Sequence, residues 1–218
     1  MDPRPRILAH RGLWQETEDQ NSPVALLAGL AEGFGIETDI RDLDGEIVIG
    51  HDPAFAGAPG FKSFLEDVLA AGVSAEVPIA LNVKSDGLLS LDCINALRES
   101  ALHYFFFDMS LPQFLLYSRR KEPVALRLSE YEDPPKILFE RLGIKGRFWL
   151  DSFEDDWWLT SKTIQELCRR YPVTVVSPEI HGRNPQAAWE WFAAGLNAGL
   201  PLSLCTDRPF DVLEVCLS

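Results

Sequence analysis

The chain has 218 residues, of which 46% are hydrophobic, and this is enough for one sizeable core. Its formal net charge is −13 at pH 7 and no basic face is evident, so we expect no nucleic-acid partner. No stretch approaches the ~18 to 20 uninterrupted apolar residues of a membrane span, and the first residues lack an apolar segment of signal-peptide length. The 4 cysteines include no CxxC pair, which favours reduced thiols and a cytoplasmic location.

Apolar runs rich in β-branched or aromatic residues alternate with segments of helical period. The predicted strands are Arg6–His10, Gly35–Ile40, Pro78–Lys84, Tyr104–Met109, Val124–Ser129, Phe148–Phe153, Val173–Pro178 and Leu202–Thr206. The predicted helices are Pro23–Gly33, Lys62–Ala71, Leu88–Ser100, Pro112–Arg120, Pro134–Leu142, Ser161–Arg170, Pro185–Ala198 and Pro209–Cys216. A hairpin arm, Glu46–Gly50, is expected after the second strand because Asp44-Gly45 is a strong tight-turn signal.

Strands and helices alternate without a long linker, which favours a parallel sheet. We therefore expect an α/β fold, a closed (β/α)8 TIM barrel, in a single domain over residues 1–218. An open doubly wound sheet is the alternative, but no GxGxxG or GxxxxGK motif follows any strand. Ser22, Asn184 and Asp207 stand before prolines at helix starts, so each is interpreted as a helix cap.

Polar and ionisable side chains gather where the predicted strands end, and this is where a barrel places its chemistry. The groups are His10, Arg11, Glu37, Asp39, Asn82, Lys84, Asp108, Arg127, Asp151, Glu179, His181 and Asp207, with His51 after the hairpin. Three of the 4 histidines belong to this set. We expect these side chains to converge at the barrel mouth.

Two pairs within this set point to a particular chemistry. Glu37 and Asp39 are two residues apart in a strand, so both carboxylates face the barrel mouth. Inward paired carboxylates usually bind a cation or share a proton. Asn82 and Lys84 also share one face of a strand, and a lysine in a barrel mouth suits a phosphate or another oxyanion.

These motifs, in this order and spacing, resemble the glycerophosphodiester phosphodiesterase family, within the phospholipase C-like phosphodiesterases. The matching segments are His10-Arg11-Gly12, Asn21-Ser22, Ile36–Ile40, Asp44-Gly45, His51-Asp52, Leu81–Lys84 and Thr206-Asp207-Arg208-Pro209. The resemblance covers most of the chain and is more specific in its first half. It implies a (β/α)8 barrel, in agreement with the strand count. It also implies hydrolysis of a glycerophosphodiester or related small phosphodiester, hence a small-molecule partner and a place in lipid metabolism.

By this resemblance, Glu37 and Asp39 would be ligands of a divalent cation, Mg²⁺ or Ca²⁺, with Asn82 at the position of a third ligand. His10 and His51 would be the general acid and base. Arg11 and Lys84 would hold the phosphate. The family commonly uses the substrate's own adjacent hydroxyl as the nucleophile, through a cyclic phosphate.

The chain departs from the family's pattern in ways that bear on the metal and the substrate. Asn82 and Gln20 stand where the family usually has glutamates, so the cation is expected to bind weakly. Glu179 and Asp151 are candidates to compensate from later strands. The insertion that lies over the glycerol site in many members is reduced to about residues 52–61.

Two other functions stay open from the sequence. One is a catalytically impaired barrel that binds a phosphate or sugar phosphate and has lost its metal site, which Asn82 and Gln20 motivate. The other is a different barrel enzyme, such as a metal-dependent aldolase or isomerase, that uses Lys84 as a base or Schiff-base amine. The leaving alcohol, the preferred ion and the oligomeric state also stay open.

Overall fold

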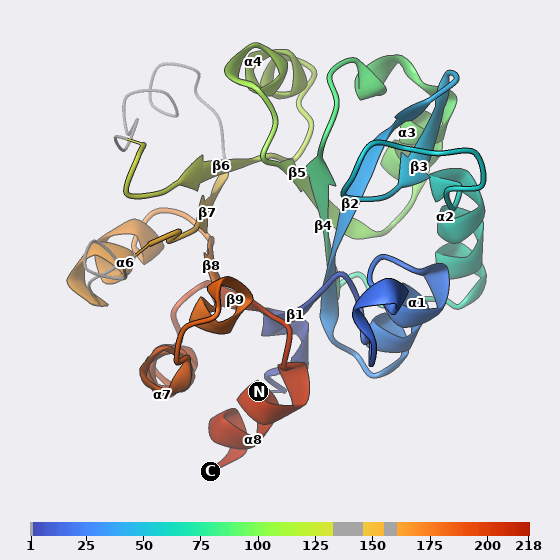
Figure 1. Cartoon of the computed structure of the whole chain (residues 1–218). Coiled ribbons are helices and arrows are strands. Elements are labelled where there is room, and N and C mark those ends of the chain that lie inside the picture. The colour runs from blue at the N-terminus through green and yellow to red at the C-terminus, as the bar shows by residue number, and fades with distance from the viewer. Residues whose placement is uncertain (1, 133–145, 155–160) are drawn as a thin grey trace.

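The computed structural model describes residues 2–132, 146–154 and 161–218, in which strands and helices alternate (Figure 1). The strands are β1 (Ile7–His10), β2 (Gly35–Leu43), β3 (Glu46–Ile49), β4 (Pro78–Val83), β5 (His103–Phe107), β6 (Ala125–Leu128), β7 (Arg147–Leu150), β8 (Val173–Val176) and β9 (Leu202–Thr206). The helices are α1 (Pro23–Ala31), α2 (Phe61–Ala70), α3 (Asp92–Glu99), α4 (Leu111–Arg119), α6 (Ser161–Cys168), α7 (Gln186–Asn197) and α8 (Pro209–Leu217).

The sheet curls into a barrel. Its parallel strands follow one another in the order β5-β4-β2-β1-β9-β8-β7-β6. The two outermost strands of this order meet in a parallel bridge between Phe106 and Val124, where the Phe106 N–H donates to the Pro123 carbonyl at 2.9 Å. The expected (β/α)8 barrel is thereby confirmed, and the open doubly wound alternative is wrong.

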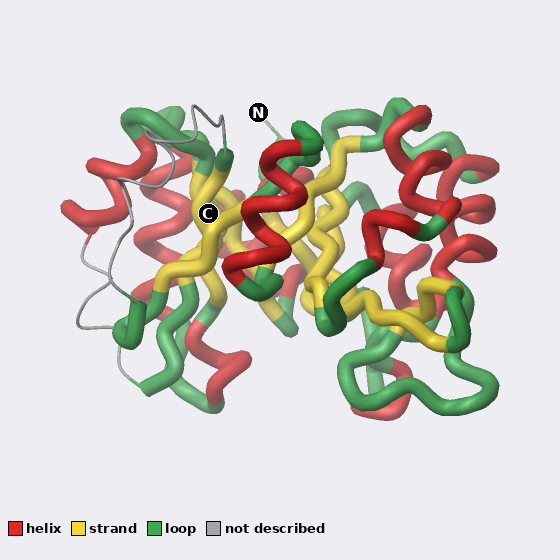
Figure 2. The backbone as a smooth tube through the Cα atoms, turned by 90° about the horizontal axis from the view of Figure 1, so that it is seen from above, coloured by secondary structure: helices red, strands yellow, loops and turns green. Residues whose placement is uncertain are grey.

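The predicted elements agree with the structure apart from their ends. Helix Pro134–Leu142 lies outside the described residues, and the predicted Leu88–Ser100 is divided into a 3-10 turn, Leu88–Ser90, and α3. The helices lie outside the ring of strands (Figure 1), and in a side view they flank the strands (Figure 2). None of the helices in the described ranges is long and apolar enough to cross a membrane.

The hairpin after β2 forms where the turn signal predicted it. β2 continues to Leu43 and pairs in antiparallel register with β3. Asp44 and Gly45 between them have φ values of 50° and 86°, the positive pair that a two-residue hairpin turn requires. Beyond β3, the chain returns to this strand where the Ile49 N–H donates to the Pro59 carbonyl at 2.8 Å. This arm carries His51 to the rim of the barrel.

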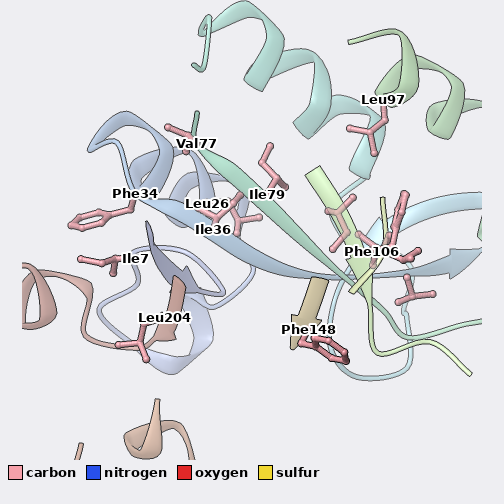
Figure 3. Close-up of a cluster of buried hydrophobic side chains, with 14 of the residues drawn as sticks. Ile7, Leu26, Phe34, Ile36, Val77, Ile79, Leu97, Phe106, Phe148 and Leu204 are labelled. Atoms are coloured by element: carbon pink, nitrogen blue, oxygen red, sulfur yellow. The ribbon is translucent and has the colours of Figure 1, made fainter. Parts of the chain in front are cut away.

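Alternation along the strands separates two apolar clusters. Side chains on the outer face, such as Ile7, Ile36 and Phe106, pack beneath the helices (Figure 3). Side chains on the inner face form a second cluster: Leu8, Ala80, Phe105, Phe107, Ala125, Trp149, Val176 and Cys205. Within it, the rings of Phe107 and Trp149 stack with their centroids 3.9 Å apart. The inner positions nearer the carboxyl ends are polar, so the candidate site rests on this apolar floor.

Gly12 explains the third residue of the His-Arg-Gly motif. Its φ is +90°, and a Cβ there would lie 2.5 Å from the carbonyl carbon of Ala25 in α1. The neighbouring Leu13 N–H donates to the Ala25 carbonyl at 2.8 Å. The absence of a side chain therefore lets the first turn of α1 lie against the loop that carries Arg11.

We expect Gly12→Ala to lower the free energy of unfolding by about 2–4 kcal/mol, because it combines an unfavourable φ with a clash against backbone. Gly45→Ala is the matched control, since Gly45 has a φ of +86° and a Cβ added there would meet nothing within 4 Å. Gly45→Ala should lower the free energy of unfolding by only about 1 kcal/mol. Urea unfolding of both variants measures the difference, and equal losses would contradict the role of close packing.

Candidate active site

A cavity of about 380 Å³ opens at the carboxyl ends of the barrel strands. One wall carries His10, Arg11, Glu37, His51, Asn82 and Lys84. Asp207 lies beside His10, and the opposite wall carries Asp108, Arg127, Asp151 and His181. Of the strand-end groups predicted to converge, all except Asp39 and Glu179 line this cavity. The sequence prediction that these residues meet in one place therefore agrees with the structure.

Strand register places the acidic residues. His10 of β1 is opposite Glu37 of β2, and Asp39 of β2 is opposite Asn82 of β4. The side chains of Glu37 and Asp39 are 2% and 0% exposed. Both carboxylates are thus inward and buried, as the two-residue spacing predicted.

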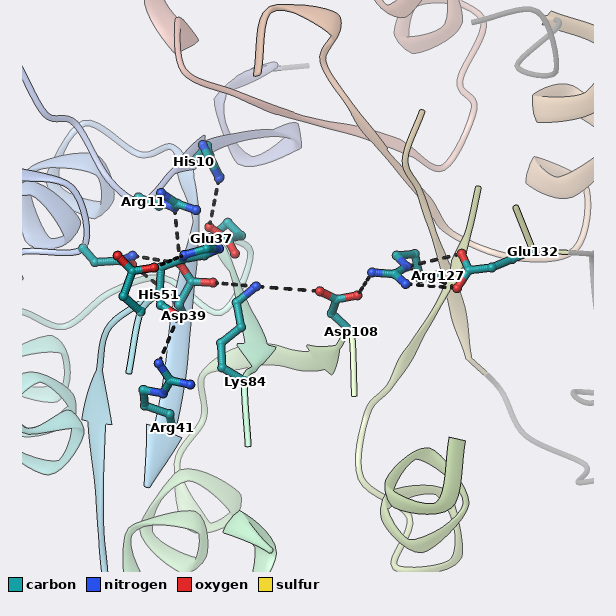
Figure 4. A network of polar contacts seen from close by, with 12 residues as sticks. His10, Arg11, Glu37, Asp39, Arg41, His51, Lys84, Asp108, Arg127 and Glu132 are labelled. Carbon is teal, nitrogen blue, oxygen red and sulfur yellow. Dashed lines mark hydrogen bonds and ion pairs between the residues drawn. The ribbon is translucent and has the colours of Figure 1, made fainter. Parts of the chain in front are cut away.

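Asp39 lies at the base of the site and is surrounded by donors (Figure 4). Its Oδ2 is 3.3 Å from Arg11 Nε and accepts a hydrogen bond from Asn21 Nδ2 at 2.8 Å. Its Oδ1 is 3.3 Å from Lys84 Nζ. Two cations and an amide therefore compensate this buried charge, and Asp39 in turn fixes the positions of Arg11 and Lys84.

Glu37 is less well compensated. The nearest cationic atom in the described ion pairs is His10 Nε2, at 3.8 Å from Glu37 Oε2. Burial and the neighbouring charge of Asp39 raise the pKa of Glu37 to about 7, against the opposing effects of His10, Arg11 and Lys84. Near neutral pH, this carboxyl is therefore divided between its protonated and ionised forms.

His10 is held between two carboxylates. Its Nδ1 donates to Asp207 Oδ1 at 2.7 Å, which directs Nε2 toward Glu37. Burial lowers the pKa of His10, but the hydrogen bond to Asp207 and the charges of Glu37 and Asp207 outweigh it, so the net shift is upward. The ring is thereby fixed in orientation and biased toward the imidazolium form.

The interpretation of Asp207 as a helix cap is wrong. The N-cap of α8 is Arg208, and no side chain caps this helix. Parallel register pairs Ala9 with Thr206, so the next residues, His10 and Asp207, emerge side by side. The signal was present in the sequence, since Asp207 directly follows the last strand, but its contact with His10 also required the last strand to lie beside the first.

His51 occupies a different environment at the rim. Its side chain is 47% exposed, and its Nδ1 lies 3.0 Å from Asp52 Oδ1, whose own side chain is 91% exposed. The backbone is better anchored, because Arg41 Nη1 donates to the His51 carbonyl at 3.1 Å. The structure brings His10 and His51 to one cavity, but of the two rings only that of His10 lies between two carboxylates, the buried Glu37 and the partly buried Asp207.

Asn21 is a positioning residue whose role sequence reasoning missed. Its Oδ1 accepts from Thr38 Oγ1 at 2.8 Å and from the Asp39 N–H at 3.2 Å, while its Nδ2 donates to Asp39. Asn21 adopts a φ of 60°, which turns its amide toward β2. Beside it, Gln20 Oε1 accepts from Arg11 Nη1 at 2.9 Å. The loop before α1 thus holds both Asp39 and Arg11.

The opposite wall is a series of ion pairs. Lys84 Nζ is 3.8 Å from Asp108 Oδ2, and Asp108 in turn pairs with Arg127 (Figure 4). Asp151 Oδ1 lies 2.8 Å from His181 Nε2. Charged groups therefore extend across the whole mouth, away from the buried acids of β2.

The two candidates for a compensating ligand differ in position. Asp151 lines the cavity but is held by His181. Glu179 accepts hydrogen bonds from the hydroxyls of Ser177 and Thr206, and from the Asp207 N–H at 3.2 Å. Glu179 therefore supports the segment that carries Asp207, and nothing in this arrangement directs it toward Glu37.

Among the described residues, three buried oxygen atoms on one wall accept no hydrogen bond: Glu37 Oε2, Asn82 Oδ1 and Asp39 Oδ1, the last of which has Lys84 Nζ as an ion-pair partner at 3.3 Å. They come from the neighbouring strands β2 and β4, and such oxygens are the ligands that Mg²⁺ and Ca²⁺ prefer. Within the described ranges, no group of three or more His, Cys, Asp or Glu side chains is arranged to hold a metal ion. The donor set thus fits a hard cation through two carboxylates and one amide.

No protein-family model and no curated protein matches the chain. Among solved structures, it is similar to an Oleispira antarctica phosphodiesterase in complex with the product sn-glycerol-3-phosphate, at 15% identity over 98% of this chain and 97% of that chain, with a TM-score of 0.71. A glycerophosphodiester phosphodiesterase from Agrobacterium tumefaciens gives 15% identity, coverage of 98% and 99%, and a TM-score of 0.72. A Xanthomonas albilineans dihydropteroate synthase is 16% identical over 97% of this chain and 91% of that chain, with a TM-score of 0.54. Similarity at this level of identity establishes the barrel fold and not the reaction.

Glu37 should make the stability of the cation-free protein depend on pH. Its pKa is raised from 4.5 to about 7 on folding, so the stabilisation present below 4.5 is lost as the pH rises through 7. The loss is about 3 kcal/mol, and Glu37→Gln should abolish it because an amide does not ionise. Urea unfolding of both proteins across this range, in the presence of a chelator, measures the difference. A difference that stays constant with pH would contradict the assignment.

Proposed function

We propose that the chain is a metal-dependent phosphodiesterase that hydrolyses a glycerophosphodiester or a related small phosphodiester. The observation that carries this proposal is the arrangement around His10, which Asp207 holds at 2.7 Å beside the buried Glu37. Arg11 and Lys84 line the same cavity. The motif resemblance and the similarity in fold to two phosphodiesterases, one of them solved with sn-glycerol-3-phosphate, support the same reaction.

Arg11 and Lys84 are the groups proposed to bind the phosphate. Arg11 contacts Asp39 through Nε and Gln20 through Nη1, which leaves Nη2 for a substrate oxygen. Lys84 lies between Asp39 and Asp108 with Nζ at 3.3 Å and 3.8 Å from their oxygens. Because carboxylates already orient both cations, little side-chain entropy is lost when the phosphate binds.

His10 and His51 are proposed to move the protons. One takes a proton from the attacking hydroxyl and the other gives one to the leaving alkoxide. Asp207 accepts from His10 Nδ1, so Nε2 is the atom that exchanges a proton with the substrate. His51, half exposed at the rim, can exchange its proton with solvent between turnovers.

A Mg²⁺ or Ca²⁺ ion would be held by Glu37, Asp39 and Asn82, each of which has a buried oxygen that accepts no hydrogen bond from the described residues. When bound, such an ion polarises phosphoryl oxygens and lowers the pKa of a nearby hydroxyl. Asn82 contributes no charge, so the affinity should be lower than that of a site with three carboxylates.

The direct test is turnover of glycerophosphocholine, glycerophosphoethanolamine and bis-p-nitrophenyl phosphate with Mg²⁺, Ca²⁺ or Mn²⁺. We expect turnover of at least one of these substrates. A chelator should abolish this activity, and Glu37→Gln should reduce it. If the folded protein turns over none of the three substrates with any of these ions, the proposal is wrong.

A second function is favoured by the compensation of Asp39. Because Arg11 and Lys84 already neutralise this carboxylate, the barrel could bind a phosphate or sugar phosphate without a metal. Calorimetry distinguishes the two functions. Heat on adding inorganic phosphate, without heat on adding millimolar divalent cation, favours the binding protein, whereas saturable cation binding favours the enzyme.

Asp207→Asn should reduce kcat/KM by about 10²–10⁴-fold, because the amide no longer selects the imidazole tautomer and orientation. Since Asp207 also raises the pKa of His10 by its hydrogen bond and charge, the limb of the pH profile that reports His10 should move to lower pH. Asp211→Asn is the matched control, because Asp211 lies in the helix that follows Asp207 and pairs only with Arg208 in the described contacts. A profile unchanged by Asp207→Asn would contradict the role.

A further inference from the structure

The opposite end of the barrel holds a second cavity, also of about 380 Å³. It lies where the strands begin, since Pro78, His103 and Arg147 are the first residues of β4, β5 and β7. Arg6, which precedes β1, and Ser203 of β9 complete the inner part of its wall. The apolar floor that includes Phe105 separates this cavity from the candidate active site.

Arg147 packs against the apolar floor from the side of this second cavity. Its guanidinium carbon lies 3.9 Å from the centroid of the Phe105 ring, and its Nη2 lies 3.4 Å from His103 Nε2. His103 also bonds to the backbone of Glu76. The cation–π contact accounts for the position of Arg147, but it does not account for the presence of Arg6 and His103 beside it.

The charge at this end is not compensated. Within the described residues, no carboxylate lies within 4.0 Å of the guanidinium nitrogens of Arg6 or Arg147, whereas Arg4, Arg11 and Arg127 all have such partners. Burial and the nearby charge of Arg6 lower the pKa of Arg147 to about 10. A chain with a net charge of −13 has many acids with which to pair these groups, yet it leaves them unpaired.

The acidic residues of this cavity lie at its outer edge. Asp2 and Glu76 are both exposed. Asp2 pairs with Arg4, with 3.4 Å between Oδ2 and Nη1. In the described part of the chain, neither acid forms an ion pair with the two inner guanidinium groups. Apart from the contact of Arg147 Nη2 with His103, the donors of Arg6 and Arg147 are therefore available to a ligand.

We propose that this cavity binds a small oxyanion, a phosphate or a carboxylate, between the guanidinium groups of Arg6 and Arg147 and beside His103. The planar fork of each guanidinium matches the paired oxygens of either group. Burial strengthens such contacts, because little water competes for the donors. This site lies at the far end of the barrel from His10, so it does not depend on the proposed phosphodiesterase function.

The test uses the imidazole signals of His103 in NMR spectra of the whole chain. Inorganic phosphate and succinate are titrated separately, with chloride keeping the ionic strength constant, and His103→Gln assigns the signals. We expect a saturable shift with at least one of the two anions, and the more effective one identifies the ligand class. Phosphate that binds in the candidate active site should shift the signals of His10 and His51 instead, so the two sites are distinguished.

Variants decide whether the shift reports a defined site. Arg6→Gln should weaken binding about tenfold or more, because it removes charge-assisted hydrogen bonds. Arg119→Gln is the matched control, since Arg119 is exposed at the end of α4 and does not line the cavity. The anion affinity of this variant should stay within twofold of that of the unaltered chain. No saturable shift of His103 with either anion, or equal weakening by both variants, would overturn the proposal.

Discussion

The buried charge of Asp39 is the constraint on which the candidate site depends. An ionised carboxylate with a fully buried side chain is tolerated only when it is paired, and removing a partner from such a group costs about 3–5 kcal/mol. Its partners come from three places in the chain: Arg11 after β1, Asn21 before α1, and Lys84 after β4. Folding the barrel with Asp39 ionised therefore requires that these groups assemble.

Glu37 shows what happens on the same strand without that compensation. It lies two residues from Asp39 and is equally buried, but among the described residues its only ion-pair partner is His10, with Nε2 at 3.8 Å from Oε2. The charge of Asp39, which gathers the cations, is also one of the causes that raise the pKa of Glu37 to about 7. One acid thus organises the scaffold, while the other keeps an oxygen available for a proton or a cation.

The sequence was sufficient to predict features that follow from the periodic spacing of residues within one strand or helix. The spacing of Glu37 and Asp39 predicted two inward carboxylates, and alternation of strands and helices predicted the barrel. The contact between His10 and Asp207 joins residues 197 positions apart and exists only because β9 closes against β1. Likewise, the exposure of His51 depends on the path of the loop after β3, for which no periodic pattern exists.

Asn82 changes the balance of charge as well as the number of ligands. Glu37 and Asp39 bring two negative charges when ionised, and Arg11 and Lys84 bring two positive charges within the same wall. With an amide at Asn82, this group is neutral without any ion, whereas a third carboxylate would leave it negative. A neutral wall attracts a divalent cation less strongly, but it also repels an anionic phosphodiester less. An amide at position 82 would therefore lower the affinity for a cation and raise the affinity for a phosphate, so these two affinities are the quantities that distinguish the proposed enzyme from a binding protein.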